Sequence, residues 1–176
     1  MTGVERPTML SEDDEDAMAQ EVAAEVEEAF ATVPYPGDGR LVASATHWES
    51  ADLVTAFRAR SWKEVPLDVL FTHRLSLPLF SPEAFRFYLP AYLIGALLHS
   101  PELDTLRENV LFLLTPPEAE GAQALRFASR MGDLDQRQTA AIRRFVELCI
   151  SEERSYPDPG RDRALAFWRD RQPSSR

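Results

Sequence analysis

One stretch, SPEAFRFYLPAYLIGALLHS at residues 81–100, constrains the fold more than any other part of the chain. On a helix that begins at Pro82, apolar side chains share one face at helical spacing: Phe85, Tyr88, Leu89, Tyr92, Leu93 and Ala96. Other apolar side chains cover most of the opposite side: Phe87, Ala91, Ile94 and Leu98. A helix that is apolar on all sides is a buried helix. The stretch therefore predicts a central helix around which the rest of an all-α domain packs.

Proline at position 90 predicts a bend in this central helix. Pro90 has no N–H to donate to the carbonyl of Arg86, and its ring crowds that group, at roughly 3 kcal/mol. Burial of one large apolar side chain contributes roughly 1.5–3 kcal/mol, so two or three aromatic anchors offset that cost. We expect a kinked helix, bent between Arg86 and Leu89, in which Gly95 lets a neighbouring helix approach closely.

Helical periodicity recurs along most of the chain. Further helices are expected over these ranges: 11–32, 50–60, 67–77, 122–131, a helix that starts after residue 133 or 135, and 162–171. The clearest apolar stripe is Ile142, Phe145, Val146, Cys149 and Ile150. Residues 103–114 fit either a short helix or a buried strand, and residues 41–43 fit a short extended piece.

The sequence thus predicts one compact helical domain over residues 11–171. It has about six to eight helices around the kinked central helix, with at most a minor strand. Residues 1–10 are expected to be a disordered acidic lead-in, and residues 172–176 a tail.

Acidic charge is concentrated at the start of the chain. The formal net charge is −10, and residues 1–40 carry eleven acidic and two basic side chains. This sign argues against nucleic acid and against an anionic membrane as partners, because phosphate groups require basic contacts. It is compatible with a basic protein partner, with solubility, or with acids that stabilise the start of a helix.

Cysteine content and hydropathy indicate a cytoplasmic protein. Cys149 is the single cysteine, so no internal disulfide can form. The N-terminus lacks the pattern of a signal peptide. The longest apolar run, residues 87–98, is too short to cross a bilayer as a helix.

No catalytic, metal or cofactor motif is recognisable in the sequence. The histidines His47, His73 and His99 are isolated, and neither H-E-x-x-H nor C-x-x-C occurs. Cys149 lies on an apolar stripe, which favours an inert core thiol over a nucleophile. We therefore predict no metal and no cofactor, and the sequence gives no positive evidence for an enzyme.

Two places are candidate binding sites. One is the turn of Tyr35, Pro36 and Gly37, where an aromatic ring lies beside a proline and a glycine. The other is the bend at Pro90, where Arg86, Tyr88 and Tyr92 could form the wall of a pocket. The structural alternative for Arg86 is that it reaches solvent or pairs with Glu83 one turn away.

Several motifs together resemble an uncharacterised family of bacterial domains of unknown function. They are the F-x-x-x-x-YPG turn at residues 30–37, WKEVPLDVL, PEAFRFYLPAYL, LFLLTPP, RQTAAIRRFVELC and ALAFW. The resemblance covers roughly residues 25–170 and leaves the acidic lead-in outside. It implies no established activity, so no functional residue is transferred from it.

Two hypotheses about function follow. The first is a non-enzymatic protein-interaction module that uses the YPG turn and the acidic first helix, for example an acidic immunity or inhibitor protein that neutralises a basic toxin. The second is a small-molecule-binding or enzymatic domain with a pocket at Pro90.

Overall fold

The structure is a computed structural model that describes residues 11–171 except 47, 100–102, 104 and 153–158. Predictions for residues 1–10 and 172–176, and for His47, lie outside the described residues. The described part contains eight α-helices: α1 (Glu12–Phe30), α2 (Ser50–Phe57), α3 (Leu67–Thr72), α4 (Pro82–Leu98), α6 (Leu106–Leu114), α7 (Ala122–Met131), α8 (Gln136–Glu152) and α9 (Pro159–Asp170). Three short 3₁₀ helices complete it: η1 (Asp38–Arg40), η2 (Trp62–Glu64) and η3 (Leu77–Leu79).

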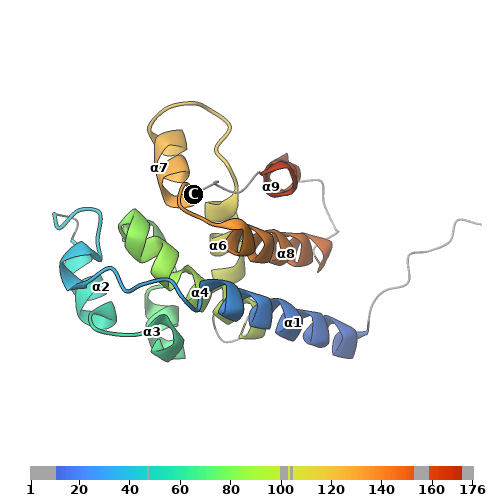
Figure 1. Cartoon of the computed structure of the whole chain (residues 1–176), viewed down its shortest axis with the longest axis horizontal. Helices are drawn as coiled ribbons and strands as arrows, with labels where there is room; N and C mark the ends of the chain where they lie inside the picture. The colour runs from blue at the N-terminus through green and yellow to red at the C-terminus, as the bar shows by residue number, and fades with distance from the viewer. Residues whose placement is uncertain (1–10, 47, 100–102, 104, 153–158, 172–176) are drawn as a thin grey trace, which may run out of the picture.

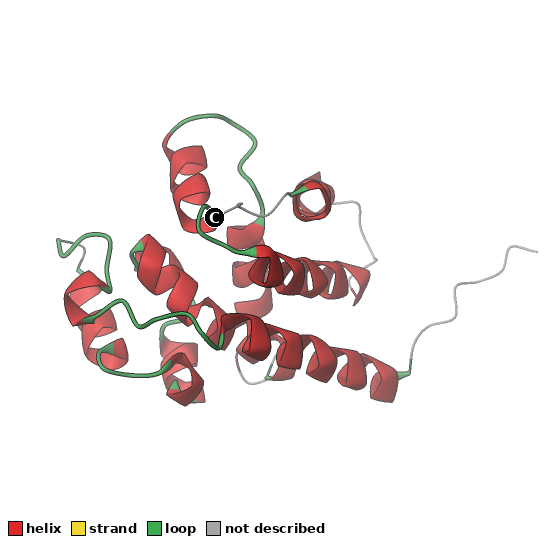
Figure 2. Cartoon of the chain, in the orientation of Figure 1, coloured by secondary structure: helices red, strands yellow, loops and turns green. Residues whose placement is uncertain are grey.

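Helix α4 lies at the centre of the arrangement (Figure 1). It packs against α1, α3, α6 and α7, while α8 lies between α1 and α9. Within the described ranges the ribbon is helix and loop throughout (Figure 2), and one isolated antiparallel bridge joins Val42 to Phe80. The prediction of a compact all-α domain is confirmed. Of the extended piece expected at residues 41–43, only the bridge at Val42 is formed, because Leu41 has the backbone angles of a helix.

The cap and the apolar surface of α4 agree with the sequence prediction. The Ser81 hydroxyl accepts a hydrogen bond from the amide of Ala84 at 3.1 Å, and Pro82 occupies the first turn. The six side chains of the predicted face are fully buried: Phe85, Tyr88, Leu89, Tyr92, Leu93 and Ala96. The helix continues through Pro90, so burial outweighs the lost hydrogen bond. The bend itself stays a prediction.

Close packing explains Gly95. A Cβ atom at this position would lie 3.0 Å from a methyl group of Leu103 and 3.3 Å from methyl groups of Leu106 and Leu70. The side chains of Leu70 and Leu106, from α3 and α6, therefore meet α4 at a glycine, as predicted.

The ambiguous segment at residues 103–114 is helical at Leu106–Leu114. Its buried side chains, Leu106, Val110 and Leu114, follow one another every four residues, which places them on one helical face. A strand would have turned alternate residues inward instead. This helix packs against α4 and α8, and that tertiary contact favours the helix over the strand.

The predicted helix at residues 67–77 is wrong in length. Helix α3 ends at Thr72. Leu70 within the helix and Leu77 beyond it are buried, whereas Leu67 and Phe71 are 39% and 42% exposed. The guanidinium of Arg74 lies 4.5 Å from the centre of the Phe71 ring, which stabilises the ring at the surface. The helices predicted at 11–32 and 50–60 also end earlier, at Phe30 and Phe57.

Helix α4 is not buried along its whole length, contrary to the prediction. Leu98 is 40% exposed and Ile94 is half-buried. Both lie near the end of the helix, beside α1. None of the described helices is long and apolar enough to cross a membrane.

Candidate functional site

The YPG turn is a structural junction. The Tyr35 hydroxyl donates a short hydrogen bond to the carboxylate of Asp38. The amide of Ala59 donates to both, at 2.9 Å to the Tyr35 hydroxyl and 3.0 Å to Asp38 Oδ1. The Tyr35 ring packs edge-on against Phe87, with ring centres 5.3 Å apart. The turn thus fastens the end of α2 to the loop after α1 and to α4.

Backbone conformation supports this junction. Gly37 has φ of 91°, where a glycine is favoured, and Pro36 is buried. Ala59 has φ of 52°, which is strained for alanine. The two hydrogen bonds from the Ala59 amide hold that conformation.

Hydrogen bonding also shifts the acidity of the junction. The Tyr35 hydrogen bond, and then the Ala59 amide, lower the pKa of Asp38 because both favour the charged carboxylate. Burial, and then the hydrogen bond to Asp38, raise the pKa of Tyr35. Asp38 is therefore held as a carboxylate and Tyr35 as a neutral phenol.

Tyr88 and Tyr92 are helix-end caps inside the core. The Tyr88 hydroxyl donates to the carbonyl of Phe57 at 2.6 Å and is 2.9 Å from that of Arg60, at the end of α2. The Tyr92 hydroxyl donates to the carbonyl of His73, at the end of α3, at 3.0 Å. Burial raises the pKa of both tyrosines, so both hydroxyls stay protonated donors.

Arg86 lies on a different side of α4 from these tyrosines. Its Nε donates to Gln138 Oε1 at 2.9 Å, and its guanidinium lies 3.8 Å from the Asp135 carboxylate. The expected pair with Glu83 is not the one formed, because α8 brings Gln138 and Asp135 to it. Gln138, buried, also donates to the carbonyl of Ala29 at 3.3 Å.

The four side chains predicted as binding residues therefore do not meet in one site. Tyr35 and Tyr88 lie close together around Phe87, Tyr92 faces α3, and Arg86 faces α8. Two cavities of the molecule, one between α1 and α4 and one beside α9, are lined neither by Pro90 nor by any of these four side chains. Their hydrogen bonds favour the structural interpretation of these residues.

A groove between α1 and α4 is the surface that sequence reasoning missed. It encloses about 510 Å³ and is lined by Asp16, Ala19, Gln20, Ala23, Ala24, Glu27, Ile94, Leu97 and Leu98. Small alanine side chains on α1 leave room on that side, and the partly exposed Ile94 and Leu98 supply its apolar wall. The feature of the sequence that could have indicated this groove is the set of alanines inside an acidic helix.

Acidic side chains stand at both ends of this groove. Asp16 is exposed near the start of α1, and Glu27, half-exposed, is held 2.6 Å from the Lys63 ammonium. In the described part of the chain, Asp13, Glu15 and Asp16 form no ion pair with a basic side chain. The start of α1 therefore carries negative charge that no basic side chain of the described residues pairs.

The opposite face of α1 is neutralised by α8. Arg144 lies 3.4 Å from the Glu21 carboxylate and 3.6 Å from that of Glu25, and Arg137 lies 3.8 Å from Glu28. These exposed pairs balance charge between α1 and α8 and each contribute little to stability. Negative charge is thus left on the groove side and at the N-terminal end.

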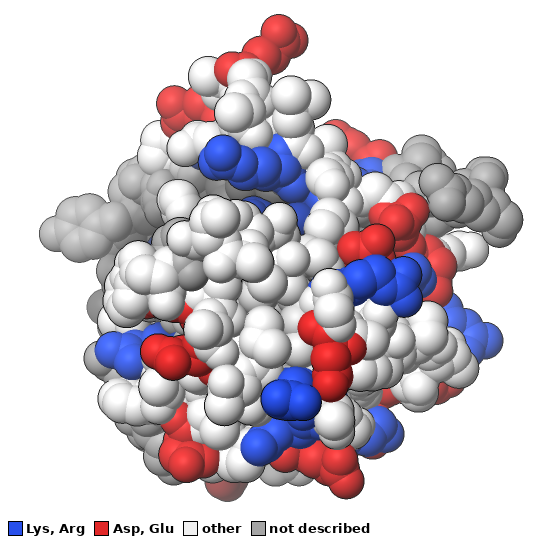
Figure 3. Space-filling model, turned by 90° about the vertical axis from the view of Figure 1, so that its left-hand side faces the viewer, with Lys and Arg blue, Asp and Glu red and all other residues white. Residues whose placement is uncertain are grey.

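The side of the molecule that lies on the left in Figure 1 has a different character. Its centre is uncharged, and basic and acidic side chains alternate around it (Figure 3). A mixed rim creates no strong field of one sign.

Groups with metal or nucleophilic chemistry are structural where they are described. Among the described residues, no three His, Cys, Asp or Glu side chains group as metal ligands would. His73 packs edge-on against Phe57, with ring centres 5.6 Å apart, and burial lowers its pKa. Cys149 is buried, as its place on the apolar stripe predicted.

Comparison with known proteins gives one match. The model of a family of unknown function (DUF6714) matches residues 18–172. No curated protein and no solved structure matches the chain.

Proposed function

Since the chain belongs to DUF6714, a family of unknown function, we propose its function from its own surface. The chain is a protein-interaction module that binds a basic amphipathic helix of a partner protein along the α1–α4 groove. The supporting observation is the combination of an apolar floor with acidic ends in one groove.

The shape of the groove suits a helix. Helix-in-groove recognition places apolar anchors every three or four residues into a hydrophobic groove. Ala19 and Ala23 leave room for such anchors, and Ile94 and Leu98 present apolar surface that a partner would bury.

The charge of the groove selects the partner. Asp16 and the neighbouring exposed acids attract Lys and Arg side chains and oppose an acidic helix. Within the chain Glu27 already binds Lys63, which supports the idea that a carboxylate on this rim accepts a lysine side chain. One concrete form of this function is an acidic inhibitor that neutralises a basic toxin.

A titration with synthetic helical peptides tests the proposal. The probe is an amphipathic peptide of leucine and lysine at helical spacing, and the comparison peptide carries glutamate in place of lysine. Calorimetry with the full chain should detect saturable binding of the lysine peptide only, and its affinity should fall as salt rises.

Matched tryptophan substitutions locate the binding surface. Ala24→Trp fills the groove without a change of charge, and Ala140→Trp places the same ring on the exposed face of α8. Ala24→Trp should weaken binding by about tenfold or more, while Ala140→Trp should leave it unchanged. Equal affinities for the two variants would remove the groove from the proposal.

A further inference from the structure

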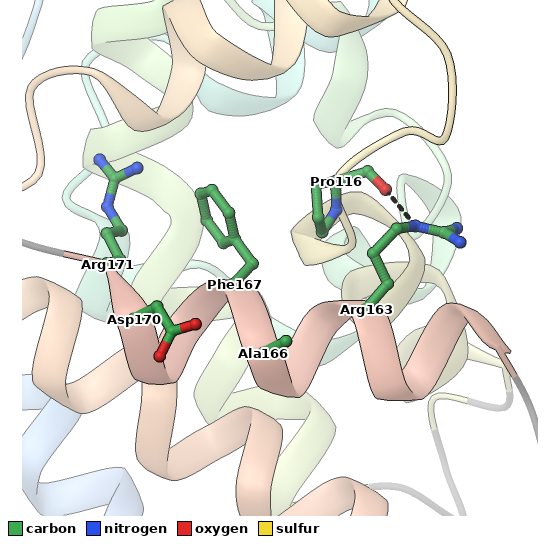
Figure 4. A pocket seen from close by; sticks show the side chains of 6 residues that line it. All are labelled: Pro116, Arg163, Ala166, Phe167, Asp170 and Arg171. Atoms are coloured by element: carbon green, nitrogen blue, oxygen red, sulfur yellow. Dashed lines mark hydrogen bonds between the residues drawn. The ribbon is translucent and has the colours of Figure 1, made fainter.

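A second groove lies along α9, at a distance in sequence from the acidic helix. It encloses about 450 Å³ and is lined by Pro116, Arg163, Ala166, Phe167, Asp170 and Arg171. Arg163 and Phe167 lie on α9 and Arg171 follows its last residue, at a spacing of four residues. Their side chains project to the same side of the helix, the side on which Pro116 lies (Figure 4). The groove thus has an aromatic centre between two arginines.

Arg163 is a fixed wall of this groove. Its Nε donates to the carbonyl of Pro116 at 2.7 Å, and its Nη1 lies 2.9 Å from a carboxylate oxygen of Glu118. The charge of Arg163 is therefore already compensated.

Arg171, at the other end, carries a charge that no acidic side chain of the described residues pairs. It donates to the carbonyl of Met131, and its guanidinium lies 5.4 Å from the centre of the Phe167 ring. Its Nε is buried and has no hydrogen-bond partner. Within the described part of the chain no carboxylate lies within ion-pair distance of it, and Asp170 points away from it (Figure 4).

Arg130, at the end of α7, is a second partly buried arginine, and it does not line the groove. Arg130 donates to the carbonyl of Pro78 at 2.9 Å, and like Arg171 it forms no ion pair with a described carboxylate. Burial lowers the pKa of both arginines, and for Arg130 the nearby Arg126 lowers it further. The carbonyls at the end of α7 favour cations there, but one carbonyl bond does not compensate a partly buried guanidinium.

We propose that the α9 groove binds a small ligand made of a flat aromatic ring and an oxyanion, carboxylate or phosphate. The oxyanion accepts hydrogen bonds from Arg171, and the ring lies against Phe167 and Pro116. Guanidinium groups bind both oxyanions through paired N–H donors. The volume of the groove is in the range of small-ligand sites.

Three probes test this ligand chemistry on the full chain: phenyl phosphate, benzoate and the neutral benzyl alcohol. Binding is followed by NMR through the amide resonances of residues 163–171. Both anions should shift these resonances saturably, and benzyl alcohol should bind at least about tenfold more weakly, because it lacks the charged acceptor. Equal affinity for all three probes, or no saturable shift with either anion, would overturn the proposal.

Substitutions then test which residue binds the oxyanion of the ligand and which binds its ring. Arg171→Gln should lower the affinity for phenyl phosphate by about tenfold or more, whereas Arg143→Gln, an exposed arginine on α8, should not. Phe167→Leu should weaken phenyl phosphate more than inorganic phosphate, because only the former has a ring. An unchanged affinity in Arg171→Gln contradicts the assignment; if that variant does not fold, the comparison of charged and neutral probes on the natural chain decides.

Discussion

Four buried side chains with polar groups bind to the ends of helices. Tyr88, Tyr92 and Trp168 each donate to a carbonyl at the end of α2, α3 or α6. Gln138 does the same for α1, at Ala29. Carbonyls at helix ends have no partner within their own helix, so these side chains satisfy groups that burial would otherwise leave unpaired.

Asp38 should make stability depend on pH through its bond to Tyr35. Its pKa is lower in the folded chain than the ordinary value of 3.8, so the ionised carboxylate favours folding. This contribution is present above the ordinary pKa and is lost as pH falls through the folded pKa. The free energy of unfolding of the natural chain should exceed that of Asp38→Asn near neutral pH, and the difference should close in acid.

The same comparison in a Tyr35→Phe variant checks the cause of this pH dependence. In Tyr35→Phe the carboxylate loses the largest source of its lowered pKa. The difference between Asp38 and its asparagine variant should then be smaller at neutral pH. Urea unfolding across the pH range measures the effect of Asp38→Asn with Tyr35 and with Phe at position 35. An equal effect in both cases would show that Tyr35 is not the cause of the pH dependence.

At the scale of elements, the apolar stripe of α8 is the feature that the sequence predicts most directly. Phe145 and Val146 are fully buried, and Ile142 and Cys149 lie beside them. Asp135 caps this helix by accepting a hydrogen bond from the amide of Gln138 at 2.9 Å. Periodicity and cap residue are both local properties, so this helix was predicted at the correct place.

Phe145→Ala should lower the free energy of unfolding by roughly 3–5 kcal/mol, because it removes a buried ring and leaves a cavity. Phe112→Ala is the matched control, since Phe112 is 77% exposed on α6. Its effect should stay within roughly 0.5 kcal/mol. Chemical denaturation of both variants measures the contrast, and a loss under about 1 kcal/mol for Phe145→Ala would contradict its place in the core.

At the scale of the whole molecule, one core connects the first helix to the last. Buried apolar residues from Ala19 on α1 to Trp168 on α9 belong to a single cluster. Trp168 is 1% exposed, and its indole N–H donates to the carbonyl of Leu114 at 2.7 Å. Unfolding of α9 should therefore be coupled to unfolding of the rest.

Trp168→Phe should shift the whole unfolding transition, at a loss of roughly 1–3 kcal/mol, because the Leu114 carbonyl loses its donor. Circular dichroism and tryptophan fluorescence should report coincident transitions in the natural chain. Trp48→Phe, at a residue that is 79% exposed, should have a small effect. A separate early transition for the C-terminal helix would contradict a single cooperative core.

The sequence by itself determined the features that depend on spacing along the chain. It predicted the all-α class, the buried face of α4, the stripe of α8 and the close approach at Gly95. These follow from the helical period and from the chemistry of a few adjacent residues, which need no knowledge of a partner.

Only the tertiary structure decided which distant groups meet. Arg86 binds Gln138 rather than Glu83, Tyr35 and Ala59 meet at Asp38, and residues 106–114 become a helix against α4. Both grooves also arise from pairs of segments, α1 with α4 and α9 with the chain at Pro116. The energy of such contacts depends on positions far apart in the chain, so a pattern of neighbouring residues cannot specify them.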